Sequence, residues 1–141
     1  MTDSLLLSLD YLYVPAPNIQ AAVRFYVEAL GGEPRWRIRH GSVWVAAVRL
    51  AEPGPLVLLA NHLEPGQLLH IYRTGSIADL QRRLTATGYS LEGEPFDIPS
   101  GPCVIFRDPG GQRLAAYERV RPEVDEVFEG RFDEYDNVTE P

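Results

Sequence analysis

The sequence predicts an α+β fold of two consecutive strand–helix–three-strand modules, followed by an acidic arm at the C-terminus. Two observations support this prediction. A strand that turns through prolines into a capped helix, at residues 9–31, returns as a second strand and helix at residues 68–88. Beyond Val120 the apolar periodicity stops and acidic side chains dominate. We therefore place one domain at residues 5–120, with modules at about 5–62 and 66–120, and the arm at residues 121–141.

The first module begins with a strand at residues 7–14, in which Tyr11 and Tyr13 share one face because side chains alternate along a strand. Prolines then end the strand, and Asn18 caps a helix that stops at Gly31. Turn residues separate the runs that follow. Three strand-like runs complete the module, at residues 35–39, 43–50 and 56–60.

The second module repeats this layout. A strand at residues 68–74 precedes Ser76, which caps a helix that ends at Gly88. Leu69 lies seven residues before Ser76, just as Tyr11 lies seven residues before the first helix cap. Chance similarity between two generic strand–helix units is the alternative, and we favour a duplicated module. Three strands are again predicted to follow, at residues 90–96, 103–107 and 113–119.

The overall composition is ordinary for one globular domain. Of the 141 residues, 45% are hydrophobic and 23% are charged. No apolar run reaches the roughly 18 residues of a membrane span, and no basic segment precedes Leu5 as in a secretory signal. The single cysteine, Cys103, excludes an internal disulfide and a multi-cysteine zinc site, and we interpret it as a small core residue. We therefore expect a cytosolic protein without a membrane partner.

The net charge of −7 is concentrated in the arm. Residues 121–141 contain eight acidic side chains and two arginines, a charge of −6, which leaves −1 for the rest of the chain. No basic face suited to nucleic acid is therefore expected. All thirteen basic residues are arginine, so catalysis through a lysine Schiff base is excluded.

The arm itself allows two interpretations. So acidic a segment is by default a solvated tail. However, it also contains several large apolar residues, which a solubility tail does not need. We therefore expect the arm to pack either on the body of the domain or on a second subunit. These anchors are Val124, Val127, Phe128, Phe132 and Tyr135.

Two motifs resemble a known family. Residues 23–26, Val-Arg-Phe-Tyr, are followed by Ala-Leu-Gly at 29–31, and Phe-Arg-Asp-Pro-Gly-Gly at 106–111 precedes the last strand. Together with the duplication, these motifs resemble the vicinal oxygen chelate superfamily, which includes glyoxalase I, extradiol dioxygenases and bleomycin-resistance proteins. The resemblance covers about residues 7–118. It implies that each half curls into a cup, that the cups form an open mixed-sheet barrel within one chain or across a dimer, and that the protein is a homodimer.

The resemblance also implies where metal ligands would lie. In the first strand of each module the family's ligand position falls on Tyr11 and Leu69, and in the last strand on Ala115 and near Val57. These side chains make a poor site for a divalent cation, so we predict no metal and no other cofactor. A one-residue strand slip would turn His70 inward, but one histidine would still lack partners.

Side-chain alternation then predicts which residues line the cup. The candidates are Tyr11, Tyr13, Trp44, Leu69, Ile71, Arg73, Ala115 and Tyr117. Core packing is an equally good explanation for any single aromatic residue among them. Arg73 is more informative, because a buried arginine needs a partner. That partner would be a ligand carboxylate, Asp97 or Glu118.

The resulting cavity is largely apolar, with tyrosine hydroxyls and one or two arginines. In residues 35–39 arginines alternate with Trp36 and Ile38, and the sequence leaves open which face points inward. Such a pocket suits a planar or amphipathic organic molecule. We therefore expect a metal-free, bleomycin-resistance-like binding protein. The alternatives are an enzyme of the same superfamily (a lyase, an isomerase, a dioxygenase-like protein or a glyoxalase-type metalloenzyme) and a protein-interaction module that uses the acidic arm.

Overall fold

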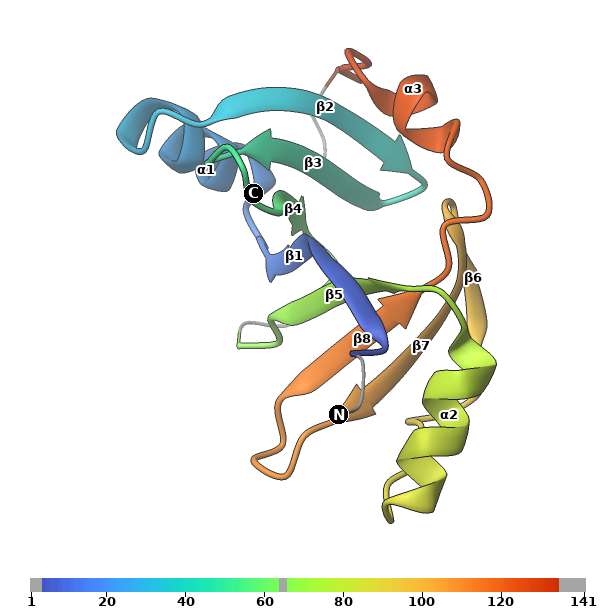
Figure 1. Cartoon of the computed structure of the whole chain (residues 1–141). Coiled ribbons are helices and arrows are strands. Elements are labelled where there is room, and N and C mark those ends of the chain that lie inside the picture. The colour runs from blue at the N-terminus through green and yellow to red at the C-terminus, as the bar shows by residue number, and fades with distance from the viewer. Residues whose placement is uncertain (1–3, 64–65, 135–141) are drawn as a thin grey trace.

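Eight strands form one curved mixed sheet in the order β2-β3-β4-β1-β5-β8-β7-β6 (Figure 1). The computed structural model describes residues 4–63 and 66–134. The strands are β1 (Leu6–Pro15), β2 (Glu33–His40), β3 (Val43–Arg49), β4 (Leu56–Ala60), β5 (Leu69–Thr74), β6 (Phe96–Ile98), β7 (Gly101–Arg107) and β8 (Arg113–Tyr117). The helices are α1 (Ile19–Arg24), which continues as the π-helix η1 (Phe25–Ala29), α2 (Ile77–Ala86) and α3 (Val124–Phe128).

The predicted duplication is confirmed by the strand order. Each half of the sheet repeats one pattern, β1-β4-β3-β2 and β5-β8-β7-β6, in which the first two strands are parallel and the others antiparallel. At the junction, β1 and β5 are antiparallel, and Tyr11 pairs with Ile71 while Tyr13 pairs with Leu69. In the sequence repeat, Tyr11 corresponds to Leu69 and Tyr13 corresponds to Ile71. Replacing each residue by its counterpart therefore turns the Tyr11–Ile71 pair into the Leu69–Tyr13 pair, and the reverse. The modules are therefore related by a local two-fold axis between β1 and β5.

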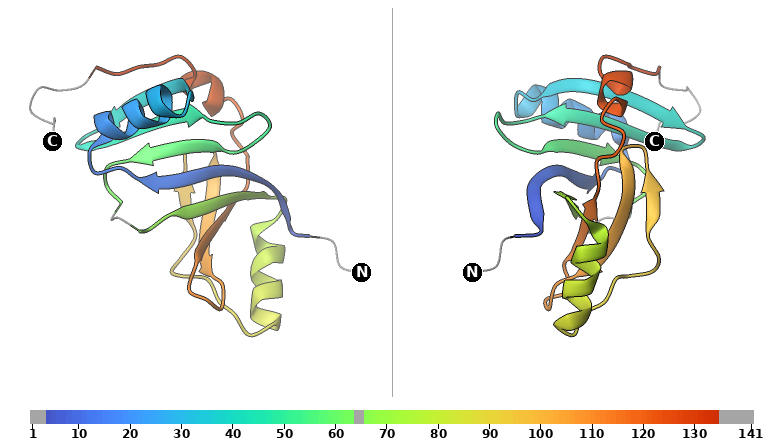
Figure 2. Two further views of the ribbon diagram at one scale, coloured as in Figure 1. Left: turned by 90° about the vertical axis from the view of Figure 1, so that its left-hand side faces the viewer. Right: turned by 45° about the vertical axis from the view of Figure 1, so that its right-hand side comes forward.

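Helices α1 and α2 each cover the outer face of their own module (Figure 2). The first begins where the Asn18 side chain accepts a hydrogen bond from the Ala21 amide at 3.0 Å, and its Ile19 packs with Trp44 and other buried residues of β3 and β4. In the second, the Ser76 hydroxyl caps α2, whose Ile77 and Leu80 pack on β7 and β8. Within the described ranges, no helix is both long and apolar enough to cross a bilayer.

The strand predicted at residues 90–96 is wrong in its position. The structure places β6 at Phe96–Ile98, and residues 89–95 form bends and irregular chain. Gly93 has a φ of +74°, which favours glycine and is incompatible with a strand. Pro95 lacks the amide hydrogen that a sheet ladder uses, so the strand begins only after it.

The segment after β8 runs back along the edge strand β2 of the first module (Figure 1). The amide of Arg37 donates to the carbonyl of Arg131 at 2.8 Å, and the amide of Asp133 donates to the carbonyl of Arg37 at 2.8 Å. Gly130 adds a third such bond to Arg35 at 3.0 Å. Of the two packing alternatives, residues 124–134 therefore follow the first and lie on their own chain. Tyr135, the last predicted anchor, lies outside the described residues.

Candidate functional site

An apolar cavity of about 400 Å³ lies on the concave face of the sheet, between the two modules. We call it the apolar chamber. Both modules and the arm contribute to its wall. The first module supplies Tyr11, Tyr13, Trp36, Ile38, Val45 and Leu58, the second supplies Leu69, Ile71, Cys103 and Ile105, and the arm supplies Val124 and Phe128. The ring of Phe128 lies 5.2 Å from that of Trp36, so α3 closes one side of the chamber against β2.

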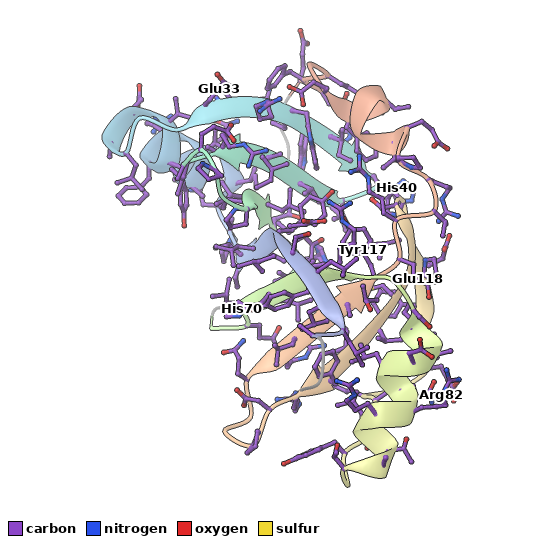
Figure 3. All side chains as sticks on the ribbon, in the orientation of Figure 1. Glu33, His40, His70, Arg82, Tyr117 and Glu118 are labelled. Atoms are coloured by element: carbon purple, nitrogen blue, oxygen red, sulfur yellow. The ribbon has the colours of Figure 1, made fainter. Side chains whose placement is uncertain are left out.

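A second, polar cavity of about 280 Å³ adjoins the first, and Tyr11 and Trp36 line both. We call it the polar chamber. It lies toward the start of β1 and the ends of β5 and β8. Its charged and hydroxyl-bearing lining residues are Asp10, Arg35, Arg49, Arg73, Tyr117, Arg119 and Glu129. Figure 3 shows Tyr117 between the strands of the two modules, whereas its neighbour Glu118 lies beside the start of α2.

Asp10 is the centre of a hydrogen-bond network that joins the modules. Its carboxylate accepts from the Ser8 hydroxyl at 2.6 Å, from Arg73 Nε at 3.0 Å and from the Tyr117 hydroxyl at 2.5 Å. A bulge between Leu9 and Tyr11 leaves Asp10 as an extra residue relative to β5. Because of the bulge this carboxylate points to the concave face, whereas simple alternation would place it on the outer face.

The network changes the pKa values of its members in opposite directions. Burial opposes ionisation of Asp10, but the hydrogen bonds from Ser8, Tyr117 and Arg73 outweigh it and hold the pKa of the carboxyl below its usual range. Burial, reinforced by the hydrogen bond to Asp10, raises the pKa of Tyr117. At neutral pH the carboxylate is therefore charged and the phenol is neutral, so Tyr117 donates a hydrogen bond to Asp10.

The two side chains predicted to pair with Arg73 are wrong, because Arg73 pairs with Asp10, and contact with a ligand carboxylate stays a prediction. Asp97 pairs instead with Arg121 at 2.7 Å, and Glu118 accepts a hydrogen bond from the Ile77 amide at 2.7 Å. Both proposed acids lie nearer to Arg73 in sequence than Asp10 does. The true partner comes from the neighbouring strand β1, which only the β1–β5 register reveals.

The structure places six of the eight predicted cavity residues on chamber walls. Tyr11, Tyr13, Leu69 and Ile71 line the apolar chamber, and Tyr11, Arg73 and Tyr117 line the polar one. Ala115 is on the same face but is wholly buried among Leu69, Ile71 and Tyr117. Contact with a ligand stays a prediction for all of them.

Trp44 is the exception, because it points away from both chambers. It is 1% exposed and packs with the helix-facing residues Ala46 and Val48 under α1. Its neighbour Val45 lines the apolar chamber instead. Both faces of β3 are apolar, so alternation alone could not identify the inner one.

On β2, the sequence left open whether Trp36 and Ile38 or the arginines point inward, and the structure decides this. Trp36 and Ile38 face the apolar chamber, while Arg37 lies outside, where its Nε donates to the carbonyl of Asp133 at 2.8 Å. A bulge between Pro34 and Trp36 changes the phase, so Arg35 reaches the polar chamber.

A family model described as the Glyoxalase/Bleomycin resistance protein/Dioxygenase superfamily matches residues 8–116. The chain belongs to this superfamily. A search of curated proteins returned no significant match. Among solved structures, the chain is similar to methylmalonyl-CoA epimerase from Mycobacterium tuberculosis, with a TM-score of 0.67 and 16% identity over 88% of this chain and 95% of that one.

Two further solved structures are similar to the chain at a comparable level. One is a hypothetical protein from Bacillus halodurans, with a TM-score of 0.64 and 17% identity over 79% of this chain and 93% of that one. The other is a variant methylmalonyl-CoA epimerase from Streptomyces coelicolor in complex with 2-nitronate-propionyl-CoA, with a TM-score of 0.64 and 14% identity over 82% and 96%. At these identities the likeness shows the glyoxalase-superfamily fold and nothing beyond it.

The superfamily's implied metal-ligand positions fall on side chains that do not fit a divalent cation. Tyr11 and Leu69 are two of them, and Ala115 is the third. The fourth is Leu58 rather than Val57, because Leu58 pairs with Tyr13 just as Ala115 pairs with Ile71. Three of these four have no donor atom. In the part of the chain that the structure describes, no cluster of three His, Cys, Asp or Glu residues could hold a metal.

The histidines do not supply the missing ligands. His70 alternates with Leu69 and Ile71, which line the chamber, and it therefore points to the outer face (Figure 3). His62 lies at the edge of the apolar chamber, where its Nε2 is 3.4 Å from the Tyr13 hydroxyl. The sequence of a turn does not indicate where its side chains point, so His62 was not among the predicted cavity residues.

Proposed function

We propose that this protein binds a small aromatic or amphipathic organic molecule non-covalently in the apolar chamber, without a metal. The observation that carries the proposal is the chamber itself, about 400 Å³ of apolar space walled by both modules and the arm. Cavities of this size and lining are typical of sites for small organic ligands. The aromatic rings of Tyr11, Tyr13 and Trp36 offer flat surfaces on which a planar ligand can stack.

The groups around the chambers favour binding over covalent catalysis. Burial raises the pKa of the Cys103 thiol to about 11, which makes it a poor nucleophile at neutral pH. Asp10 has a lowered pKa and three hydrogen-bond donors, which makes it a weak general base. A lyase or isomerase of the same superfamily is the second candidate, and the contact between Tyr117 and Asp10 is the observation in its favour.

Titration with the neutral fluorescent probe N-phenyl-1-naphthylamine tests the proposal. We expect one saturable site, because the probe is apolar, planar and small enough for the chamber. Ile38→Trp and Ile105→Trp, one from each module, fill the chamber and should weaken probe binding at least about tenfold. Val127→Trp adds the same ring at a position that is 61% exposed, and should leave the affinity unchanged.

The two candidate functions give different results in follow-up experiments. Binding that is absent, or that is insensitive to both chamber-filling variants, would refute the proposal. A thermal-shift screen of aromatic metabolites and antibiotics would then identify tighter ligands by concentration-dependent stabilisation. Mass spectrometry after incubation should recover each ligand unchanged, whereas systematic turnover that Tyr117→Phe abolishes would favour the enzyme.

A further inference from the structure

We propose that the Ser100 hydroxyl binds an uncharged polar group of the ligand, so that the ligand of this protein is an aromatic molecule with a hydroxyl, carbonyl or amide group. Ser100 would then select such a ligand over one made of hydrocarbon alone. This inference rests on the proposed function, because it assigns a chemical class to the ligand of the apolar chamber.

The first support is that the Ser100 hydroxyl is buried without a partner. Ser100 lies in the turn between β6 and β7, where it is 7% exposed and lines the apolar chamber. Among the described residues, no backbone or side-chain group hydrogen-bonds to its hydroxyl. A buried hydroxyl without a partner is unfavourable, and buried polar groups are generally satisfied. A ligand in the chamber can supply the missing partner.

The second support is that the backbone around Ser100 is held in place. The Ser100 carbonyl accepts hydrogen bonds from the amides of Val120 at 3.1 Å and Arg121 at 2.9 Å. The Arg121 guanidinium group in turn donates to the carbonyls of Pro99 at 2.8 Å and Ile98 at 2.7 Å. These bonds fix the turn from the segment that follows β8. A hydroxyl on a fixed turn is preorganised to bind a ligand.

The third support is a comparison with other polar side chains in the wall of the apolar chamber, which have contacts within the protein. The Tyr13 hydroxyl lies 3.4 Å from Nε2 of His62, and Arg113 pairs with Glu92 at 3.3 Å. These groups must give up or share a contact to bind a ligand, whereas the Ser100 hydroxyl gives up none. Ser100 is therefore the group that gains most from a ligand hydrogen bond.

The surroundings of Ser100 indicate that the ligand group is uncharged. In the same hairpin, Ile98, Pro99 and Cys103 also line the chamber. The Cys103 thiol is protonated at neutral pH, because burial raises its pKa to about 11. Moving a charged group from water against such a wall costs far more than one neutral hydrogen bond returns. A neutral hydroxyl, carbonyl or amide group does not carry that cost.

Two matched pairs of small molecules test the inference. 1-Naphthol and 2-naphthol each differ from the corresponding methylnaphthalene only by a hydroxyl in place of a methyl group of similar size. Displacement of N-phenyl-1-naphthylamine, whose own affinity is measured for each variant, gives the dissociation constants. Ser100→Ala should weaken binding of at least one naphthol about fivefold, because it removes one neutral hydrogen bond. Binding of the methylnaphthalenes should change less than about twofold.

Stability and a second serine provide the controls. Ser100→Ala should leave the midpoint of urea unfolding unchanged, because its hydroxyl has no partner in the described part of the chain. Ser90→Ala removes an exposed hydroxyl that does not line the chamber, and should change the binding of none of the four molecules.

The outcomes separate this inference from the proposed function. If the fluorescent probe binds but Ser100→Ala weakens each naphthol and its methyl counterpart equally, or neither, the Ser100 site is refuted and the proposed function survives. The same conclusion follows if neither naphthol displaces the probe, or if the urea midpoint falls, which would show that the hydroxyl is bonded within the protein. If the probe itself does not bind, the proposed function fails.

Discussion

The two modules share one strand order but use their faces differently. In the first module the concave face presents aromatic rings, from Tyr11, Tyr13 and Trp36, and its tightest core lies on the other face under α1. In the second module the concave face is mostly aliphatic, and its side chains form a buried cluster around Ala115 that includes Tyr117 and is packed by Tyr11 and Tyr13 of the first module. The two modules thus share one backbone layout. The side chains on each face determine whether that face packs as core or lines the chamber.

The largest effect is expected for the two tryptophans of the first module, which lie on opposite faces. Trp44→Ala should lower the free energy of unfolding by about 4 kcal/mol, because it empties the core under α1. Trp36→Ala should cost less, about 2 kcal/mol, because that ring borders a cavity. Probe binding should show the reverse, lost in Trp36→Ala and kept in Trp44→Ala. Urea unfolding measures the stability of the two variants, and probe titration measures their binding. A Trp44→Ala protein that folds without binding the probe would contradict the placement of Trp44 outside the chamber.

In the second module, the reactivity of Cys103 measures how far water reaches the buried cluster on the concave face. Its pKa of about 11 means that it should react with a disulfide reagent at pH 8 on the order of a hundredfold more slowly than an exposed thiol. The rate should keep rising with pH up to about 11 instead of levelling off near 9. The exposed thiol of a Cys103→Ala, Ser90→Cys double variant gives the reference rate. Equal rates for the two thiols would show that the second module is open to water.

The contact between the modules depends on Asp10, and it should be sensitive to pH. Asp10→Asn should cost about 2 kcal/mol, less than for a fully buried pair, because the Arg73 side chain is 37% exposed. The pKa of Asp10 is lower in the folded chain than in the unfolded one, so its contribution is complete above roughly pH 4 and is lost as pH falls further.

Urea unfolding of both proteins at pH 7 and pH 3 measures this effect. The difference between wild type and Asp10→Asn should shrink at the lower pH, where the wild-type carboxyl begins to protonate. Glu28→Gln, in a surface pair whose Glu28 side chain is 70% exposed, should change stability by less than about 0.5 kcal/mol at either pH. A difference that stays constant with pH would mean that charge is not what joins the modules.

The smallest change in stability is expected for α3 of the arm, whose Phe128 lies against Trp36 of the first module. Phe128→Ala should cost about 1 kcal/mol, because Phe128 is only partly buried, and should weaken probe binding several-fold by opening the wall beside Trp36. Val127→Ala, at a neighbouring position that is 61% exposed, is the control. Unchanged affinity in Phe128→Ala would remove the arm from the site.

The fold could be predicted from sequence because its signals are local. The caps Asn18 and Ser76 and the alternating apolar residues are enough to show the repeat. The bulges could not be predicted in this way. One extra residue at Asp10 and one near Arg35 each shift the phase of a strand, and no residue type is required there. Those two shifts bring Asp10 and Arg35 into the polar chamber, so alternation predicted its residues Arg73 and Tyr117 but not these two.

The limits of alternation also explain the smaller errors. Trp44 and Val57 lie on strands that are apolar on both faces, and such strands do not reveal which side is inward. The arm itself was predicted, but its path along β2 was not, for another reason. Its backbone hydrogen bonds to Arg35 and Arg37 join residues almost a hundred positions apart, and they depend on backbone geometry that leaves no residue pattern.

These backbone bonds also limit how copies of the chain can associate. On β2, the outward peptide groups from Arg35 to Arg39 are taken up by Gly130, Arg131 and Asp133. A neighbouring chain therefore finds no free strand edge there, whereas β6 at the other end of the sheet has no strand beyond it among the described residues. Association by strand pairing would therefore have only the β6 edge to use among the strands that the structure describes. The arm thus closes the β2 end of the sheet to a further strand.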